Sequence, residues 1–135
     1  MKKDNANYSF LLVEDYPGII AGVTEIIMAM YNPKKVDLMV AKTVDDAKRI
    51  ILQKSSNLNA IMVDGSLGHS QVETLPIIAL IMEQRKKGVF NGKIIAISGS
   101  NETNEVLMTA GCDEMVIKSR IGDYICSGKL VSVTK

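Results

Sequence analysis

The hydrophobic residues of this chain form short runs that alternate with longer stretches of helical spacing. Five runs are candidate strands, at 9–13, 36–41, 59–63, 93–97 and 114–117. The first, third and fourth are almost continuously apolar, as is typical of strands covered on both faces. Strands that alternate with helices predict a parallel sheet with crossover helices.

The first two helices are predicted from apolar spacing and from residues that favour helix starts. Apolar residues recur at helical spacing from Ile19 to Met30, and Pro17 stands near the start, where its missing N–H group costs nothing. Thr43 followed by Asp46 resembles a capping box and predicts the start of the second helix.

The remaining helices are less regular in sequence. The third is predicted over 72–87, but Pro76 is comfortable only in a first turn, so the regular helix can begin as late as Thr74. The fourth is predicted over 102–110, with a polar cap before it and a glycine after it. A fifth helix after Lys118 has a sparse apolar stripe and two glycines that lower its helix propensity.

Length and composition indicate one domain with an ordinary core. The chain has 135 residues, of which 47% are hydrophobic, but aromatic residues make up only 4% and there is no Trp. We expect residues 1–7 to be an N-terminal tail and residues 8–135 to form the domain. Sixteen basic and fifteen acidic residues give a net charge of +1, which does not indicate a nucleic-acid-binding surface.

The cysteines and the apolar runs bear on the compartment. Cys112 and Cys126 lack CxxC spacing and accompanying histidines, so neither a metal cage nor a disulfide framework is expected. The N-terminus lacks the apolar stretch of a signal peptide, and no apolar run approaches the length of a membrane span. We therefore expect a cytoplasmic protein without membrane contact.

Polar side chains follow four of the five predicted strands. The first strand is followed by Glu14 and Asp15, the third by Asp64, the fourth by Ser98 and the fifth by Lys118. Parallel sheets of this class present functional groups at the carboxyl ends of their strands. Each residue alone has an ordinary explanation as a cap, a turn residue or a solvated lysine, but together they predict a shared site.

The chemistry of this group of side chains favours a metal-assisted phosphoryl acceptor. Three close carboxylates repel one another unless a cation neutralises them, and oxygen ligands with open positions suit Mg²⁺. Asp64, on the expected central strand, is the candidate nucleophile for a phosphoryl group. Mg²⁺, the hydroxyl of Ser98 and the ammonium of Lys118 would each stabilise one phosphoryl oxygen. Gly99 leaves space beside Ser98.

Four motifs carry a resemblance to a known family. They are FLLVED (10–15), IMVD (61–64), IIAISG (94–99) and EMVIK (114–118). Their residue types, order and spacing resemble those of the receiver domain of two-component response regulators. The resemblance covers roughly residues 8–130, and all five characteristic positions are filled.

The resemblance implies a fold and a function. The fold would be a flavodoxin-like (βα)₅ three-layer α/β sandwich with parallel sheet order 2-1-3-4-5. A histidine kinase or histidine phosphotransfer protein would transfer a phosphoryl group to Asp64, with Mg²⁺ held by Glu14, Asp15, Asp64 and the backbone carbonyl of Ser66. The protein would not be an enzyme for a separate substrate, because it would catalyse only its own phosphotransfer and dephosphorylation. Its signal would pass through a protein-binding surface made by the fourth helix, fifth strand and fifth helix.

Three positions depart from the family pattern. Met115 stands where a Tyr or Phe switch residue is usual, so the expected switch pair is Ser98 and Met115. Ser119 replaces the proline that usually follows the lysine, and Tyr16 stands where a third acid is common. Tyr16 is therefore in a position to cover part of the site.

Two alternative functions are compared with the phosphoacceptor. A phosphatase of the haloacid-dehalogenase type also uses a strand-end Asp with Mg²⁺, but it needs a second Asp two residues later, where this chain has Ser66. A pseudo-receiver would keep the fold as a docking module without phosphorylation, and Met115 and Ser119 keep this alternative open.

The expected output is a contact with another protein. The sequence shows no DNA-binding or catalytic domain after the predicted receiver, so we expect no direct nucleic acid binding. A downstream protein target fits a stand-alone receiver, whereas a missing effector domain fits an excised part of a longer protein. The sequence leaves both possibilities open.

Overall fold

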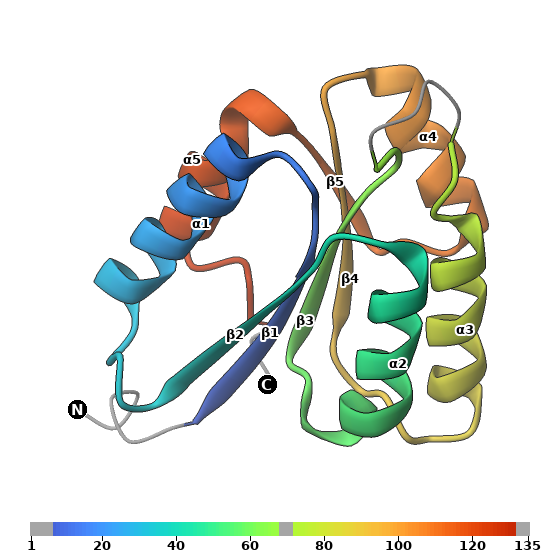
Figure 1. The fold of residues 1–135 in the computed structure, drawn as a ribbon, viewed down its shortest axis with the longest axis horizontal. Helices are drawn as coiled ribbons and strands as arrows, with labels where there is room; N and C mark the ends of the chain where they lie inside the picture. The colour runs from blue at the N-terminus through green and yellow to red at the C-terminus, as the bar shows by residue number, and fades with distance from the viewer. Residues whose placement is uncertain (1–6, 68–71, 132–135) are drawn as a thin grey trace.

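The computed structural model describes residues 7–67 and 72–131, which form strands and helices in alternation (Figure 1). The strands are β1 (Tyr8–Val13), β2 (Val36–Ala41), β3 (Ala60–Asp64), β4 (Lys93–Ser98) and β5 (Glu114–Ile117). The α-helices are α1 (Pro17–Met30), α2 (Val44–Lys54), α3 (Leu75–Lys86), α4 (Asn101–Ala110) and α5 (Ile121–Cys126). Two short 3₁₀ helices, η2 (Ser55–Asn57) and η3 (Lys118–Arg120), precede β3 and α5.

The five strands form one parallel sheet in the order β2-β1-β3-β4-β5, so the predicted α/β fold class is confirmed. β3 lies at the centre, between β1 and β4, and all five of its residues are buried. The register pairs Val13 with Val63, and Asp64 with Ile97. The carboxyl ends of β1, β3 and β4 therefore lie side by side at one edge of the sheet.

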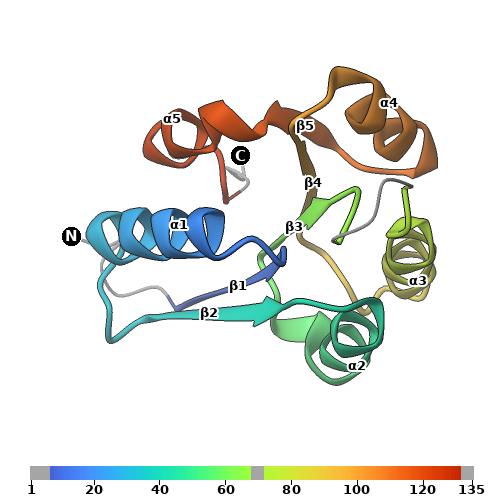
Figure 2. The ribbon, with the colours of Figure 1, turned by 45° about the horizontal axis from the view of Figure 1, so that its top comes forward.

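Helices cover both faces of the sheet, giving three layers (Figure 2). α1 and α5 pack on one face, and α2, α3 and α4 pack on the other. Alternate residues of each strand enter the two cores: Phe10 and Leu12 pack with α1 and α5, whereas Leu11 and Val13 pack with the other three helices. This alternation explains why the central strands are apolar throughout.

The predicted elements agree with the structure to within about a residue at most boundaries, and α3 agrees with the late start near Thr74 that Pro76 allowed. The structure begins α3 at Leu75 instead of residue 72, and ends it at Lys86. Before the helix, the N–H of Glu73 and the hydroxyl of Thr74 both donate to the carbonyl of Gly65. These two donors bond the segment before α3 to the loop after β3, and the carbonyl of Thr74, the N-cap residue, accepts from the N–H groups of Ile77 and Ile78 in the first turn of α3.

The capping residues behave as the sequence predicts for α2 and α4. Thr43 Oγ1 accepts a hydrogen bond from the N–H of Asp46, and Ser100 Oγ accepts one from the N–H of Thr103. Ser100 is therefore the cap of α4, which begins three residues after Ser98. This short connection brings the first turn of α4 close to the sheet edge.

The fifth helix is short, as its glycines predict. It follows the η3 turn, and Gly128 beyond it has φ of 82°. Gly122 also has a packing role, since a Cβ there would lie 3.0 Å from Ile26 Cδ1 in α1. The close approach of α1 and α5 thus favours a residue without a side chain at this position.

The limits of the description affect two predictions. Residues 1–6 of the predicted tail, and residues 132–135 of the predicted domain, lie outside the described residues. Within the described parts of the chain, no helix combines the length and the apolar character that a membrane span needs.

Candidate functional site

An open pocket of about 610 Å³ lies at the carboxyl edge of the sheet. Its lining residues are Asp15, Tyr16, Pro17, Asp64, Ser66, Ser98, Gly99, Ser100, Thr103 and Lys118. The residues predicted from the strand ends lie at this edge, because each is the last residue of its strand or follows it within two positions. Glu14 is fully buried and does not line the pocket, but it contacts residues that do.

Lys118 joins two of the strand ends through its ammonium group. Its Nζ donates to Asp64 Oδ2 at 2.8 Å and to Glu14 Oε2 at 3.2 Å. Burial alone would lower the pKa of Lys118, but the hydrogen bond and charge of Asp64, together with Glu14, raise it overall. The lysine is therefore held in its charged form, between the carboxylate of Glu14, which directly follows β1, and that of Asp64, the last residue of β3.

The carboxylates of Glu14, Asp15 and Asp64 form a compact cluster. One oxygen from each lies within 4.8 Å of the others, and Asp64 is only 4% exposed. Burial, and then the charge of Asp64, raises the pKa of Glu14. The N–H of Tyr16 donates to Glu14 Oε2 at 3.1 Å, whereas Oε1 is buried without a hydrogen-bond partner among the described residues.

The charge of this cluster tests whether a metal fits. Three ionised carboxylates and the ammonium of Lys118 leave two negative charges, which a divalent cation would cancel. The donor set consists of oxygen atoms, which Mg²⁺ and Ca²⁺ prefer, and the pocket leaves room for water. The buried Oε1 of Glu14 has no hydrogen-bond partner among the described residues, and a metal-bound water could supply one. The residues present therefore fit Mg²⁺.

Ser98 places a hydroxyl group beside Asp64 on the side of β4, opposite to Glu14 and Asp15, which follow β1. It is the last residue of β4 and is 6% exposed. Its Oγ accepts a long hydrogen bond of 3.3 Å from the N–H of Ser100. At Gly99 a Cβ would meet no atom within 4 Å, so the space beside the hydroxyl is open, as the sequence predicts.

Two further predicted site residues have different positions. Ser66 lines the pocket, and its N–H donates to Asp64 Oδ1 over 3.4 Å, while the metal-binding role of its carbonyl stays a prediction. Met115 lies in β5 opposite Ala96 and is 42% exposed, and it does not line the pocket. Its switch role also stays a prediction.

Thr103 is a pocket residue that the strand-end pattern did not reveal. It lies in the first turn of α4, and its Cγ2 occupies the space where a Cβ on Gly65 would stand. A sequence signal existed in the capping serine at position 100, which places the first helical turn next to the strand end. The contact with Gly65 itself depends on how α4 packs.

Comparison with known proteins identifies the fold. Response regulator Rcp1 in its Mn²⁺-bound form is 21% identical, with a TM-score of 0.69 over 94% of this chain and 97% of that chain. The receiver domain of the histidine kinase CKI1 from Arabidopsis thaliana, complexed with Mg²⁺ and BeF₃⁻, is 17% identical, with a TM-score of 0.69 and 95% coverage of both chains. A response regulator receiver protein from Pseudoalteromonas atlantica is 16% identical, with a TM-score of 0.67 over 88% and 91%.

The sequence matches neither a family model nor a curated protein. The structural likeness therefore stands on its own, and at these identities it establishes the fold. The chain has the fold of response regulator receiver domains, with an acidic cluster at the carboxyl edge of its sheet. The resemblance seen in the four sequence motifs thus agrees with the structures to which the chain is similar.

Proposed function

We propose that this domain accepts a phosphoryl group on Asp64 from a histidine kinase or a histidine phosphotransfer protein. The observation that carries the proposal is the arrangement around Asp64: its carboxylate lies 2.8 Å from the Lys118 ammonium and within 4.8 Å of oxygens from Glu14 and Asp15. A nucleophile, a fixed cation and a divalent-metal site are what phosphoryl transfer to a carboxylate requires.

The transfer breaks the bond between phosphorus and the donor atom as a carboxylate oxygen of Asp64 bonds to phosphorus. Lys118 stabilises negative charge on one phosphoryl oxygen, and the Ser98 hydroxyl donates to another. Glu14, Asp15, Asp64 and the carbonyl of Ser66 would hold Mg²⁺. When bound, Mg²⁺ supplies Lewis-acid stabilisation of the phosphoryl charge.

The short connection after Ser98 supports output through the surface of α4, β5 and α5. Ser98 accepts from the N–H of Ser100, and the Ser100 hydroxyl caps α4 through Thr103. Further along the helix, the buried amide of Asn104 donates to the carbonyl of Val116 in β5. A movement of the Ser98 hydroxyl towards a phosphoryl group would therefore alter its hydrogen bond with the Ser100 N–H and could shift the start of α4.

The partner on this surface would be a protein target, or an effector domain of the same polypeptide. Val106 and Met115 are each 42% exposed, on α4 and β5 respectively, and they offer apolar contact area. The proposal includes no direct nucleic acid binding, and it assigns catalysis only to the protein's own phosphorylation and dephosphorylation.

A docking module that is not phosphorylated is the alternative. Met115 and Ser119 keep it open, because a flexible thioether stands where the aromatic switch residue is usual and no proline follows Lys118. A phosphatase of the haloacid-dehalogenase type is disfavoured by Ser66, whose hydroxyl cannot act as the required carboxylic acid.

The test is phosphorylation by a small donor in the presence of Mg²⁺, followed by intact mass. Wild type should gain the mass of one phosphoryl group, and Asp64→Ala should gain none. Asp113→Ala is a matched control, because Asp113 is paired with Arg85 at another part of the surface and should not affect labelling. A wild-type protein that stays unmodified would favour the docking module.

A further inference from the structure

Tyr16 is an exposed aromatic residue at the rim of the phosphoacceptor pocket. The residue is 61% exposed. All six aromatic residues lie in the described part of the chain, and the other five are buried or half-buried. The rings of Tyr8, Phe10 and Tyr31 pack against one another, whereas no other ring stacks on Tyr16. An unpaired ring beside a charged site is available to a ligand.

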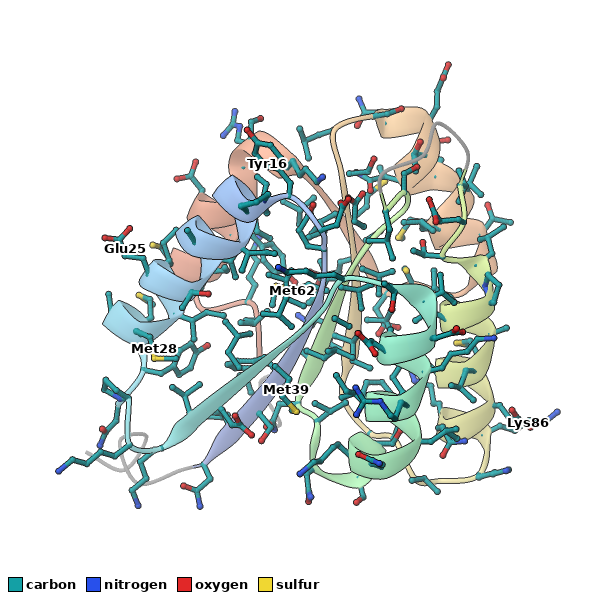
Figure 3. The ribbon with its side chains drawn as sticks, in the orientation of Figure 1. Tyr16, Glu25, Met28, Met39, Met62 and Lys86 are labelled. Atoms are coloured by element: carbon teal, nitrogen blue, oxygen red, sulfur yellow. The ribbon has the colours of Figure 1, made fainter. Side chains whose placement is uncertain are left out.

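The backbone holds Tyr16 in this position. Its N–H donates to Glu14 Oε2, and its extended conformation, with φ of −83° and ψ of 118°, is the one favoured before Pro17. Figure 3 shows Tyr16 at the start of α1, at the carboxyl edge of the sheet. The residue is thus tied to the same carboxylate that binds Lys118.

Gly18 provides the surface on which the ring rests. A Cβ on Gly18 would lie 2.8 Å from Tyr16 Cε2, so any larger residue would displace the ring. The ring therefore packs over the first turn of α1 and lines the pocket that contains Asp64.

We propose that the face of Tyr16 binds the imidazole ring of the phosphodonor and so makes the site selective for phosphoimidazole chemistry. This inference rests on the proposed function of Asp64. A phosphohistidine donor presents a flat ring, and this ring is cationic when its second nitrogen carries a proton. The π face of tyrosine attracts such a cation.

The transfer itself is balanced without a further reactant. The P–N bond breaks as a carboxylate oxygen of Asp64 bonds to phosphorus, and the electron pair of the P–N bond returns to the ring nitrogen. The second ring nitrogen keeps its proton, so the ring leaves as neutral imidazole. Tyr16 takes no part in bond making, and acts as a residue that orients the leaving ring.

The experiment compares three donors with and without a ring. Phosphoimidazole has a P–N bond and a ring, phosphoramidate has a P–N bond without a ring, and acetyl phosphate has neither. Rate constants for labelling with Mg²⁺ are measured from intact-mass time courses. The quantity of interest is the ratio of the phosphoimidazole rate constant to that of phosphoramidate.

Four variants give the expected pattern. Tyr16→Ala should lower the ratio by about 2- to 10-fold, the range set by aromatic and cation–π contacts. Tyr16→Phe keeps the ring face and should keep the ratio. Gly18→Ala should lower the ratio although Tyr16 remains, because its new Cβ displaces the ring. Leu52→Ala, which removes a side chain of similar exposure (63%) on α2, should leave the ratio unchanged.

Each other outcome counts against the inference. Equal slowing of all three donors in Tyr16→Ala would mean that Tyr16 only shapes the pocket, and an unchanged ratio would mean that it contributes nothing to selectivity. In both cases labelling of wild-type Asp64 would leave the proposed function intact. Failure of every donor to label wild type would refute the proposed function and this inference together.

Discussion

In the absence of metal, the ammonium of Lys118 reduces the repulsion between the buried carboxylates of the cluster. This ammonium contacts Asp64 and Glu14, whose side chains are 6% and 0% exposed, and the lysine side chain is 24% exposed. Lys118→Met keeps the length of the side chain and removes the charge. The three carboxylates would then lose the positive side chain that pairs with Glu14 and Asp64 in the described part of the chain.

The expected loss of stability follows from this burial. Removing one partner of a buried ion pair typically costs about 3 to 5 kcal/mol, and the partial exposure of Lys118 places the expected loss near the lower value, at about 3 kcal/mol. For a domain of this size, about 3 to 4 °C of melting temperature corresponds to each kcal/mol. We therefore expect Lys118→Met to melt about 10 °C below wild type in EDTA.

Mg²⁺ should reverse much of this loss, because a divalent cation replaces the missing charge. At a concentration 100 times its Kd, a ligand stabilises the folded state by about 2.7 kcal/mol. The assay is thermal or urea unfolding of both proteins, in EDTA and in saturating Mg²⁺. The variant lacks the competing ammonium, so we expect it to bind Mg²⁺ about 10-fold more tightly than wild type. At a Mg²⁺ concentration far above both Kd values, the difference in stability should then shrink by about 1.4 kcal/mol, which is about half.

Two further variants make the reasoning refutable. Lys93→Met removes a lysine that is 13% exposed and lies 3.5 Å from Glu114, at the start of β4 and away from the cluster. Its loss of stability should be the same in EDTA and in Mg²⁺. Adding Glu14→Gln to Lys118→Met should recover stability in EDTA, because it removes one of the uncompensated charges. Equal stability of Lys118→Met and wild type in EDTA would refute the electrostatic account.

Three smaller predictions concern packing and thiol chemistry. Gly65→Ala should destabilise the fold by about 1 to 3 kcal/mol, because its Cβ overlaps the Thr103 methyl group, and Thr103→Ser should relieve much of that loss in a double-mutant cycle; purely additive effects in urea unfolding would contradict this. Gly92→Ala should cost at least as much, because the new Cβ would meet a backbone carbonyl just before β3, and a melting temperature equal to wild type would refute the clash. Burial raises the pKa of Cys112 to about 12, so a thiol reagent at neutral pH should label only the exposed Cys126 in the folded protein and both thiols in denaturant. Labelling of both thiols at equal rates in the native protein would contradict the burial. The same raised pKa means that, between pH 9.0 and about 12, the folded state keeps a thiol proton that the unfolded state loses. This thiol's contribution to stability should therefore fall as the pH rises through that range.

Much of the fold could be predicted from local patterns. Each strand is a short apolar run, and each helix carries an apolar stripe, so the alternation of elements can be read from neighbouring residues. The chemistry of the strand ends is also local, since Asp64 and Ser98 are simply the last residues of their strands. The order of the sheet came from the family resemblance, because spacing along the chain does not say which strands are neighbours.

The features that the sequence did not predict depend on contacts between residues far apart in the chain. Pro76 indicated that α3 could begin as late as Thr74, one residue before its actual start at Leu75, but the bonds of Glu73 and Thr74 to Gly65 were not visible in any local pattern. Gly122 looked like a weakness of α5, but it also allows α1 to approach.

By itself, the sequence determined the elements and the residue types that each strand presents at its carboxyl end. Only the tertiary structure decided that Lys118 lies between Asp64 and Glu14, which are 54 and 104 residues away along the chain. It also decided that Tyr16 rests on Gly18 at the rim of the same pocket. The physical reason is that hydrophobic periodicity is set by residues a few positions apart, whereas charge neutralisation and ring placement depend on atoms that only sheet pairing and helix packing bring together.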